Sequence, residues 1–345
     1  MTIHLMTKSR SASEVLAWSR ITVEPALRAA VNTLPSSMRH VAGYHFGWWN
    51  EHGQPEQANG GKAIRPTLVL LSAAAVGGVP TAAVPAAAAV DLVHNFSLLH
   101  DDVMDSDLTR RHRRTAWSVF GINAAILAGD ALLALALDLL AASGHPAATD
   151  GIRILSAAVQ DLLDGQCADL DLEQHTEAEL ADCLSMAKRK TGALMGCACA
   201  IGASFGGGRP QQVEQLRRFG EHLGLAFQHV DDLLGIWGDP AVTGKPVYSD
   251  LLSRKKSLPV VAALSSDTSA GRELAELYRG IRPLSDTDLV HVAELIDIAG
   301  GRAWSHTQVD DLLRQAMREL RQATPAAPAA EELDALARLA THRDH

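Results

Sequence analysis

The chain has 345 residues, 47% of them hydrophobic, which is enough for one large core or two smaller ones. Alanine is abundant and aromatic residues make up only 4%, a composition that favours helices. The net charge of −9 excludes a broad basic surface suited to nucleic acid, so an anionic ligand would have to bind at local clusters of cations.

Turn-forming stretches separate segments of about 20–30 residues, many with apolar positions at helical spacing. The turns fall at residues 33–38, 51–62, 77–85, 143–150, 206–210, 238–246 and 281–288. No segment shows a convincing run of alternating strands. We predict an all-α fold of about ten helices with one large packed bundle as its core. A single domain should cover residues 1–345, with residues 1–12 disordered and a short helix after the Pro/Ala-rich stretch that follows Thr324.

The N-terminus lacks the apolar core of a signal peptide. The most apolar run, residues 124–142, is interrupted by Gly129, Asp130 and Asp138, and we expect it to be too short and too charged to cross a membrane. The cysteines show no metal-binding or redox spacing, and we expect buried free thiols in a reducing compartment. They are Cys167, Cys183, Cys197 and Cys199. A cytoplasmic protein without a transmembrane segment is expected.

A short acidic stretch, "HDDVMDSDLTRR", follows an apolar run at residues 100–111. On a helix Asp101 and Asp105 share one face, and Asp102 lies about 100° round on the flank. A solvated acidic face is one interpretation. The acids, however, continue the apolar face of a core-lining helix, and carboxylates gathered there favour a hard cation such as Mg²⁺.

A second acidic pair, Asp231 and Asp232 in "FQHVDDLLGIWGDP", again ends an apolar helical run. The position that matches Asp105 is Gly235, which has no side chain to bind a metal. A single DDxxD motif is weak evidence. Two acidic motifs with basic residues at particular offsets are a much more specific signal.

Several small clusters of lysine and arginine surround these motifs. The cations are Lys62, Arg65, Arg110, Arg111, Lys190, Lys245, Lys255 and Lys256. Each cluster alone is most simply a solvated surface patch. Together, in an acidic chain, they suit a diphosphate, because guanidinium and ammonium groups form charge-assisted hydrogen bonds to phosphate oxygens. A P-loop is excluded, since five residues separate Gly238 from Gly244 and Pro246 stands where Ser or Thr is required.

From Gly60 to Pro259 the chain resembles the trans-isoprenyl diphosphate synthases, the polyprenyl synthetase family. The motifs that carry the resemblance lie in the family's order: "GGKAIRP", "LLHDDVMDSDLTRR", "GDALLA", "GQCADLDLE", "KTGAL", "FQHVDD" and "GDPAVTGKP". The resemblance implies a helical bundle around a central apolar cavity, the isoprenoid synthase type I fold. It also implies a homodimer that uses Mg²⁺ to join isopentenyl diphosphate to an allylic diphosphate.

The resemblance implies a role for each matching residue. Asp101 and Asp105 would bind two Mg²⁺ ions with Asp102 in support, and Asp231 would bind a third with Asp232 in support. The residues expected to hold the allylic diphosphate are Arg110, Lys190, Lys245 and Lys255. Those expected to hold isopentenyl diphosphate are Lys62, Arg65, His94 and Arg111. Lys190 and Lys245 would act in catalysis, and Thr191 and Gln228 would lie near the reacting carbons. Gly235 departs from the family pattern and predicts a weaker third metal site.

Product length is expected to depend on the residues just before the first motif. Phe96 is bulky and Ser97 is small, a combination that in the family resembles a geranylgeranyl (C20) synthase, with farnesyl (C15) as the neighbouring possibility. A class I terpene cyclase shares the fold and one acidic motif, but the second motif and the few aromatics argue against it. A non-catalytic regulatory subunit is the other alternative, although such subunits usually lose aspartates that this chain keeps.

Overall fold

The computed structural model describes residues 9–56, 58, 61–175, 178–240, 246–280 and 282–341. The chain divides into two compact units, and each is described by itself. Unit 1 is Met1–Val159, Leu194–Arg218 and Glu319–Leu336, and unit 2 is Gln160–Ala193, Phe219–Arg318 and Ala337–His345. The single domain over residues 1–345 stays a prediction.

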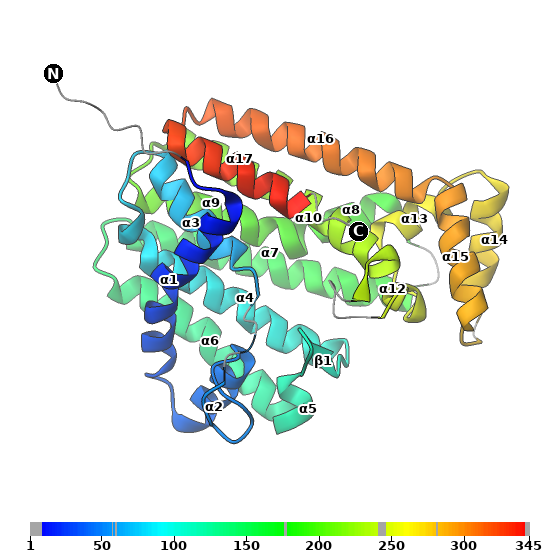
Figure 1. Cartoon of the computed structure of the whole chain (residues 1–345), viewed down its shortest axis with the longest axis horizontal. Coiled ribbons are helices and arrows are strands. Elements are labelled where there is room, and N and C mark those ends of the chain that lie inside the picture. Colours follow the sequence, from blue (N-terminus) through cyan, green and yellow to red (C-terminus); the bar gives the residue numbers. More distant parts are fainter. Residues whose placement is uncertain are drawn as a thin grey trace. The chain divides into compact units, whose positions relative to one another are not determined.

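Helices dominate both units (Figure 1), which confirms the all-α prediction. Unit 1 contains α1 (Ala12–Val31), α2 (Ser36–His45), α3 (Ile64–Ala75), η1 (Pro80–Ala83), α4 (Val84–Met104), α5 (Ala116–Phe120), α6 (Ile122–Ala142) and most of α9 (Ala193–Phe205). It also contains a two-stranded hairpin of β1 (Thr109–Arg110) and β2 (Arg113–Arg114). The hairpin follows the last turn of α4 directly and is therefore placed beside the first acidic motif.

Unit 2 contains α8 (Leu180–Ala187), the π-helical turn η2 (Lys188–Gly192), α12 (Ser249–Leu252), α13 (Leu258–Leu264), α14 (Ser269–Arg279) and α15 (Asp286–Ile298). Besides α9, four helices of the described part of the chain contribute residues to both units: α7 (Ala148–Gln174), α10 (Pro210–Trp237), α16 (Gly301–Gln322) and α17 (Ala327–Thr341). The helices outnumber those predicted, because α5, α8, α12 and α13 have eight residues or fewer and are too short to show a helical period.

The start of α1 is well anchored. Ser11 and Glu14 form a capping box, in which Ser11 N–H donates to the Glu14 carboxylate at 2.8 Å and Ser11 Oγ accepts from Glu14 N–H. Arg10 donates from Nε and Nη2 to the two carboxylate oxygens of Glu332, both at 2.8 Å. The predicted disorder of residues 1–12 is therefore wrong for Arg10–Ala12, because a bidentate ion pair and a cap fix this segment. Residues 1–8 lie outside the described residues.

Helices α4 and α6 pack along each other in unit 1 (Figure 1). A Cβ atom on Gly129 of α6 would lie 2.4 Å from Nε2 of His100 and 3.5 Å from the ring of Phe96, both on α4. The side chain of His100 therefore occupies the space that only glycine leaves open. The close contact fixes the last turns of α4, which carry the first acidic motif.

Among the described residues, two helices are long and apolar enough to cross a membrane by length and composition alone. They are Pro80–Met104, whose most apolar window is 67% buried, and Ile122–Ala142, whose window is 39% buried. The prediction that the second run is too short and too charged is therefore wrong, because its two aspartates do not lower the mean hydropathy enough. The evidence for a membrane span is weak, since core helices pass the same test.

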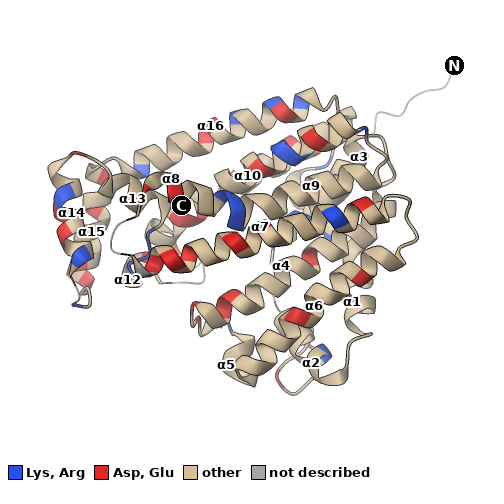
Figure 2. Cartoon of the chain, turned by 180° about the vertical axis from the view of Figure 1, so that it is seen from behind, with Lys and Arg blue, Asp and Glu red and all other residues tan. Residues whose placement is uncertain are grey.

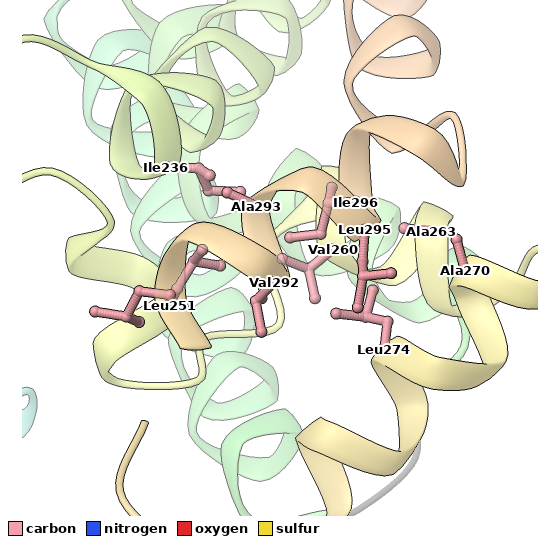
Figure 3. Packing of buried hydrophobic residues seen from close by; sticks show 11 residues of the cluster. Ile236, Leu251, Val260, Ala263, Ala270, Leu274, Val292, Ala293, Leu295 and Ile296 are labelled. Carbon is pink, nitrogen blue, oxygen red and sulfur yellow. The ribbon is translucent and has the colours of Figure 1, made fainter. Parts of the chain in front are cut away.

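The core of unit 2 is built around α13, α14 and α15 (Figure 3). Val260, Leu274 and Val292 are fully buried there, and the cluster also includes Ile236 from the last turn of α10 and Leu251 from α12. Burial of such side chains contributes about 1.5–3 kcal/mol each. The short α12 is thus packed against the same hydrophobic cluster as the end of α10.

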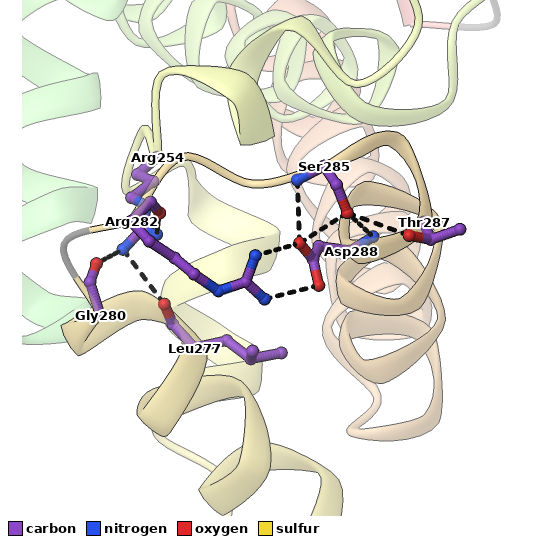
Figure 4. A network of polar contacts seen from close by, with 7 residues as sticks. All are labelled: Arg254, Leu277, Gly280, Arg282, Ser285, Thr287 and Asp288. Atoms are coloured by element: carbon purple, nitrogen blue, oxygen red, sulfur yellow. Dashed lines mark hydrogen bonds and ion pairs between the residues drawn. The ribbon is translucent and has the colours of Figure 1, made fainter.

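Arg254, just after α12, donates hydrogen bonds to the C-terminal end of α14 (Figure 4). Its Nη1 donates to the carbonyl oxygens of Leu277 and Tyr278, each at 3.1 Å, and to that of Gly280. These carbonyls end α14 and have no partner within the helix, so the guanidinium serves as a C-terminal cap. The segment from α12 to α13 is consequently fixed at both ends.

Three of the four cysteines are buried, as predicted, and one is not. Cys183, Cys197 and Cys199 are buried, and burial raises the pKa of the Cys183 thiol to about 11. Cys167 is exposed, so the prediction that all four are buried is wrong.

Acidic and basic residues are interspersed along the helices in the view of Figure 2, as expected for a chain without a broad basic surface.

Candidate active site

The first acidic motif occupies the last turn of α4. Asp105 is the C-cap of the helix, and its N–H donates to the carbonyl oxygen of Asp101 at 2.8 Å, so the two residues keep the i, i+4 relation. Carboxylates at a helix C-terminus face the negative end of the helix dipole, which disfavours them by about 0.3–1 kcal/mol each. The arrangement is unfavourable for the fold alone and becomes favourable when a cation binds.

Asp102 is buried behind this pair, with 1% of its surface exposed. Its Oδ1 accepts from Nε of Arg110 at 2.6 Å, and its Oδ2 is buried without a hydrogen-bond partner among the described residues. Burial raises the pKa of Asp102 to about 6, and the charge of Arg110 holds it from rising further. Asp102 therefore orients Arg110, and its supporting role at a metal site stays a prediction.

The hairpin turn directs the two predicted arginines to different neighbours. Arg111 and His112 form the two-residue loop between β1 and β2, and their φ angles of 51° and 64° both lie in the left-handed region. Arg110 reaches back to Asp102. The guanidinium of Arg111 instead lies against Gly61, where a Cβ atom would be 2.6 Å from Nη2. Backbone strain of this kind is common at binding sites.

Arg111 belongs to a second cationic group in unit 1. Arg65 Nη1 donates to Nε2 of His94 at 3.2 Å, so that nitrogen is the acceptor of a neutral imidazole. Burial, and then the charges of Arg65 and Arg111, lower the pKa of His94 well below its usual value. Asp91 carries the balancing charge, and burial raises its pKa to about 6 against the opposing effect of Arg111. Lys62 is exposed and immediately follows Gly61.

In unit 2, Lys190 lies in the π-helical turn η2 and is ion-paired with Asp169 of α7, with 2.6 Å between Nζ and Oδ2. A Cβ atom on Gly165 would lie 2.4 Å from the backbone nitrogen of Lys190, so the absence of a side chain lets α7 approach the turn. Single π turns within helices are frequent at functional sites.

A chain of hydrogen bonds runs from the π turn to the second acidic motif. Thr191 Oγ1 donates to Oε1 of Gln228 at 2.6 Å, and Nε2 of Gln228 donates to Oδ1 of Asp232 at 2.8 Å. The other oxygen of Asp232 accepts from the backbone N–H of Leu258 at 2.9 Å. Asp232 is buried, and burial raises its pKa to about 7 against the opposing charge of Lys255. Both oxygens of Asp232 thus accept hydrogen bonds within the protein, and its supporting role at a metal site stays a prediction.

The remaining predicted residues are placed as follows. Asp231 is half-buried on α10, one position before Asp232, and Lys255 is half-buried between α12 and α13. Phe96 is buried with its ring centroid 4.8 Å from that of His100, and Ser97 Oγ donates to the carbonyl oxygen of His94 at 2.9 Å. Lys245 lies outside the described residues.

Two residues of the site received no role from the sequence. Asp169, the partner of Lys190, lies in the quoted motif "GQCADLDLE". Gln166 in the same motif is buried, and both amide atoms lack a hydrogen-bond partner among the described residues. A buried amide without a partner costs about 1–3 kcal/mol and points to a polar ligand. Helical spacing could have placed both on one face of α7.

The donors of these motifs fit Mg²⁺. No group of three or more His, Cys, Asp and Glu side chains among the described residues is close enough to hold a metal by itself. Mg²⁺ does not need one, because it binds through one or two carboxylates together with water and substrate phosphates. The oxygen ligands of Asp101 and Asp105, backed by the unpartnered Oδ2 of Asp102, meet that requirement.

A helical fold with carboxylates at helix ends and paired cations beside them defines a class of enzymes that act on diphosphates. Comparison with known proteins specifies the class. The polyprenyl synthetase family model matches residues 48–296. The chain is 46% identical over 330 residues to a (2E,6E)-farnesyl diphosphate synthase of Mycobacterium tuberculosis, covering 94% of this chain and 92% of that protein. It is 44% identical to a geranylgeranyl diphosphate synthase of the same organism, covering 96% and 93%.

Solved structures agree. A polyprenyl synthetase from Streptomyces coelicolor superposes with a TM-score of 0.91 and 44% identity, over 95% of this chain and 99% of that one. A geranylgeranyl pyrophosphate synthase from Corynebacterium glutamicum, complexed with isoprenyl diphosphate and magnesium, gives a TM-score of 0.83 at 26% identity, over 97% and 100%. The chain belongs to the polyprenyl synthetase family. It is a trans-isoprenyl diphosphate synthase, a transferase that condenses isopentenyl diphosphate with an allylic diphosphate.

Proposed function

We propose that this synthase uses Mg²⁺ and makes mainly geranylgeranyl (C20) diphosphate. The observation that carries the metal dependence is the end of α4, where Asp101 and Asp105 share one face and Arg110 is held beside them. When bound, Mg²⁺ neutralises the leaving diphosphate. Asp101, Asp105 and Asp231 are its proposed carboxylate ligands, three ions per active site. The magnesium named in the Corynebacterium structure supports the choice of metal.

The chain's own residues bind the two substrates. Arg110 and Lys190, together with Lys245 and Lys255, hold the allylic diphosphate by charge-assisted hydrogen bonds. The group of Lys62, Arg65, His94 and Arg111 holds isopentenyl diphosphate. Neutral His94 accepts from Arg65 and so fixes the direction of that guanidinium.

The reaction exchanges one bond for another without a side-chain nucleophile. The allylic C–O bond breaks, and diphosphate leaves with the electron pair. The isopentenyl double bond then forms the new C–C bond to the allylic cation, and a proton passes to the departing diphosphate. The oxygens of Thr191 and Gln228 stabilise the cation, because their mutual hydrogen bond fixes both dipoles.

Phe96 supports the C20 product. It is a bulky aromatic residue of α4 five positions before Asp101, and its ring contacts the ring of His100 and lies beside Gly129 of α6. The two Mycobacterium relatives do not decide between C15 and C20, since their identities differ by only two percentage points, 46% against 44%.

The test is to incubate the purified chain with labelled isopentenyl diphosphate, an allylic starter and Mg²⁺, and to measure product length. We expect C20 from the wild type, longer products from Phe96→Ala, and C15 from Ser97→Phe, which adds a second aromatic ring. A main product of C30 or longer, or no change in Phe96→Ala, would refute the chain-length proposal. Turnover without isopentenyl diphosphate would indicate a cyclase, and an inactive purified chain would indicate a regulatory subunit.

We also propose a cytoplasmic homodimer without a transmembrane segment. Ile122, Ile126 and Leu127 of α6 are 50%, 37% and 52% exposed, an apolar face that a second copy would cover. Sedimentation analysis of the purified chain tests the dimer, and cell fractionation tests the location.

A further inference from the structure

Arg113 of β2 joins the hairpin that follows the first acidic motif to α2. Its Nη1 donates to the carbonyl oxygen of Tyr44 at 2.9 Å, and its Nη2 donates to that of Trp49 at 3.2 Å. Nη2 also donates to Oε2 of Glu56 at 2.9 Å. The guanidinium carbon lies 4.4 Å from the centroid of the Tyr44 ring, which is a cation–π contact. One side chain thus connects β2 with the end of α2 and with the loop that follows this helix.

The segment that Arg113 contacts is itself fixed by packing within α2. Trp49 Nε1 donates to the carbonyl oxygen of His40 on α2 at 2.8 Å. A Cβ atom on Gly43 would lie 2.0 Å from Cζ2 of Trp49, so the indole ring occupies space that only glycine leaves open. The Tyr44 hydroxyl donates to the carbonyl oxygen at position 114 of β2, at 2.8 Å. The hairpin is therefore held against a well-packed base.

The hairpin needs this support because it is short. β1 and β2 pair over two residues each, Thr109 with Arg114 and Arg110 with Arg113. A two-stranded hairpin by itself is at best marginally stable in water. Arg110 and Arg113 are also like charges directly opposite each other, which destabilises the pair. Each arginine has a partner outside the hairpin, Asp102 for Arg110 and the α2 segment for Arg113.

The turn between the two strands carries Arg111, a residue of the proposed isopentenyl diphosphate site. The guanidinium of Arg111 lies against Gly61, where a Cβ atom would be 2.7 Å from Cζ. Gly61 is held from α1, because Nη2 of Arg20 donates to its carbonyl oxygen. Arg113 comes directly after the two-residue turn, so a displacement of β2 would move the turn and Arg111 with it.

We propose that Arg113 is a positioning residue of the isopentenyl diphosphate site. It holds β2 on α2 and thereby keeps the Arg111 guanidinium beside Gly61, while its own Nη1 and Nη2 donate within the protein. The proposal rests on the diphosphate-binding role of Arg111 in the proposed function. The third arginine of "RRHRR" then contributes to substrate affinity through Arg111 rather than by a phosphate contact of its own.

A contribution to stability through charge alone is the competing explanation. The ion pair with Glu56 is partly exposed and contributes little, as surface ion pairs do. Arg113→Lys keeps this pair and its charge, but lysine lacks the planar fork of donors that reaches two carbonyl oxygens. If only the charge of Arg113 mattered, lysine would replace it without consequence. The proposal predicts that lysine does not replace it.

The test is steady-state kinetics on the full chain, with isopentenyl diphosphate varied and the allylic substrate and Mg²⁺ saturating, for Arg113→Ala, Arg113→Lys and the control Arg153→Ala. Arg153 is an exposed arginine of α7 in the same unit. We expect both Arg113 variants to raise KM for isopentenyl diphosphate by about 10-fold, since misplacing a positioned group by about 1 Å can cost up to about 100-fold. The value of kcat should change much less, because this diphosphate is not the leaving group. Arg153→Ala should leave both constants unchanged.

A double-mutant cycle with Arg111 distinguishes a positioning role from a structural one. Arg111→Ala removes the group that Arg113 is proposed to direct, so adding Arg113→Ala to it should raise KM no further. Additive effects of the two substitutions on KM, or an unchanged KM in Arg113→Lys, would overturn the proposal. An unchanged KM in Arg111→Ala itself would show that the proposed isopentenyl diphosphate site has failed, and not only this inference.

Discussion

The two acidic motifs show how one sequence pattern is completed in two ways. In both, the first aspartate is half-buried near the end of a helix. The second is buried and hydrogen-bonded, Asp102 to Arg110 and Asp232 to Gln228 and Leu258. The first motif obtains its last acid from the same helix. The second has Gly235 there, and the Asp250 carboxylate fills the space.

The comparison shows that the space beside the last position of each motif, Asp105 or Gly235, is filled by a carboxylate, although that carboxylate comes from a different residue in the second motif. In unit 1 that volume is filled by Asp105, one turn after Asp101. In unit 2 the short helix α12 fills it, and this requires α12 to be fixed by Arg254 and by the hydrophobic cluster that it forms with α13 and α15 (Figure 3). Substitutions should therefore affect the two motifs differently.

The largest expected difference is in catalysis. Asp101→Asn should lower kcat by about 10³-fold and Asp231→Asn by about 10²-fold, the range for losing one electrostatic contact to developing charge. The first motif should be more sensitive because Asp101 is proposed to serve two ions and Asp231 one. Steady-state kinetics with saturating Mg²⁺ measures both.

The exposed Asp138→Asn on α6 is the control for these variants and should retain full activity. A larger loss in Asp231→Asn than in Asp101→Asn would reverse the comparison between the motifs. Equal losses in all three variants would show that the assay reports net charge rather than metal binding.

A smaller difference is expected in stability, at the two buried aspartates. Asp232→Asn should lower the free energy of unfolding by about 1–3 kcal/mol, because an amide accepts only one of the two donors, Gln228 Nε2 and Leu258 N–H. Asp102→Asn should cost less, since Oδ1 still accepts from Arg110 and Oδ2 has no partner among the described residues to lose. Urea unfolding in the presence of a chelator measures both.

The pH dependence sharpens this comparison. Asp102 has a pKa of about 6 in the fold, above the unfolded value near 4. The folded state binds this proton more tightly, so the wild type should lose stability as pH rises from about 4 to about 6. Asp102→Asn should lack that loss, and its stability relative to the wild type should improve with pH. A difference in the free energy of unfolding between the wild type and Asp102→Asn that stays constant from about pH 4 to about pH 6 would contradict the expected titration of Asp102.

Most of the fold and the first motif could be predicted, because they depend on local periodicity. Helical spacing placed Asp101 and Asp105 together and Asp102 on the flank, and the structure keeps that arrangement. Two features could not be predicted. The φ angles of the hairpin decide that Arg110 and Arg111 reach different neighbours, and the side chain packed on Gly235 is that of Asp250 in α12, fifteen residues later. Periodicity carries no information on such tertiary contacts.

The smallest effect is expected at the hairpin that follows the first motif. His112 has a φ of 64°, which costs a residue with a Cβ atom about 1–2 kcal/mol relative to glycine. His112→Gly should therefore raise the free energy of unfolding by up to about 1 kcal/mol, since glycine also gains freedom in the unfolded chain. Thermal unfolding measures the change, with the exposed His291→Gly on α15 as a helical control that should destabilise.

If His112→Gly destabilises as well, the strain is not stored at this residue. An accompanying rise in KM for isopentenyl diphosphate would show instead that His112 holds Arg111 in its binding position.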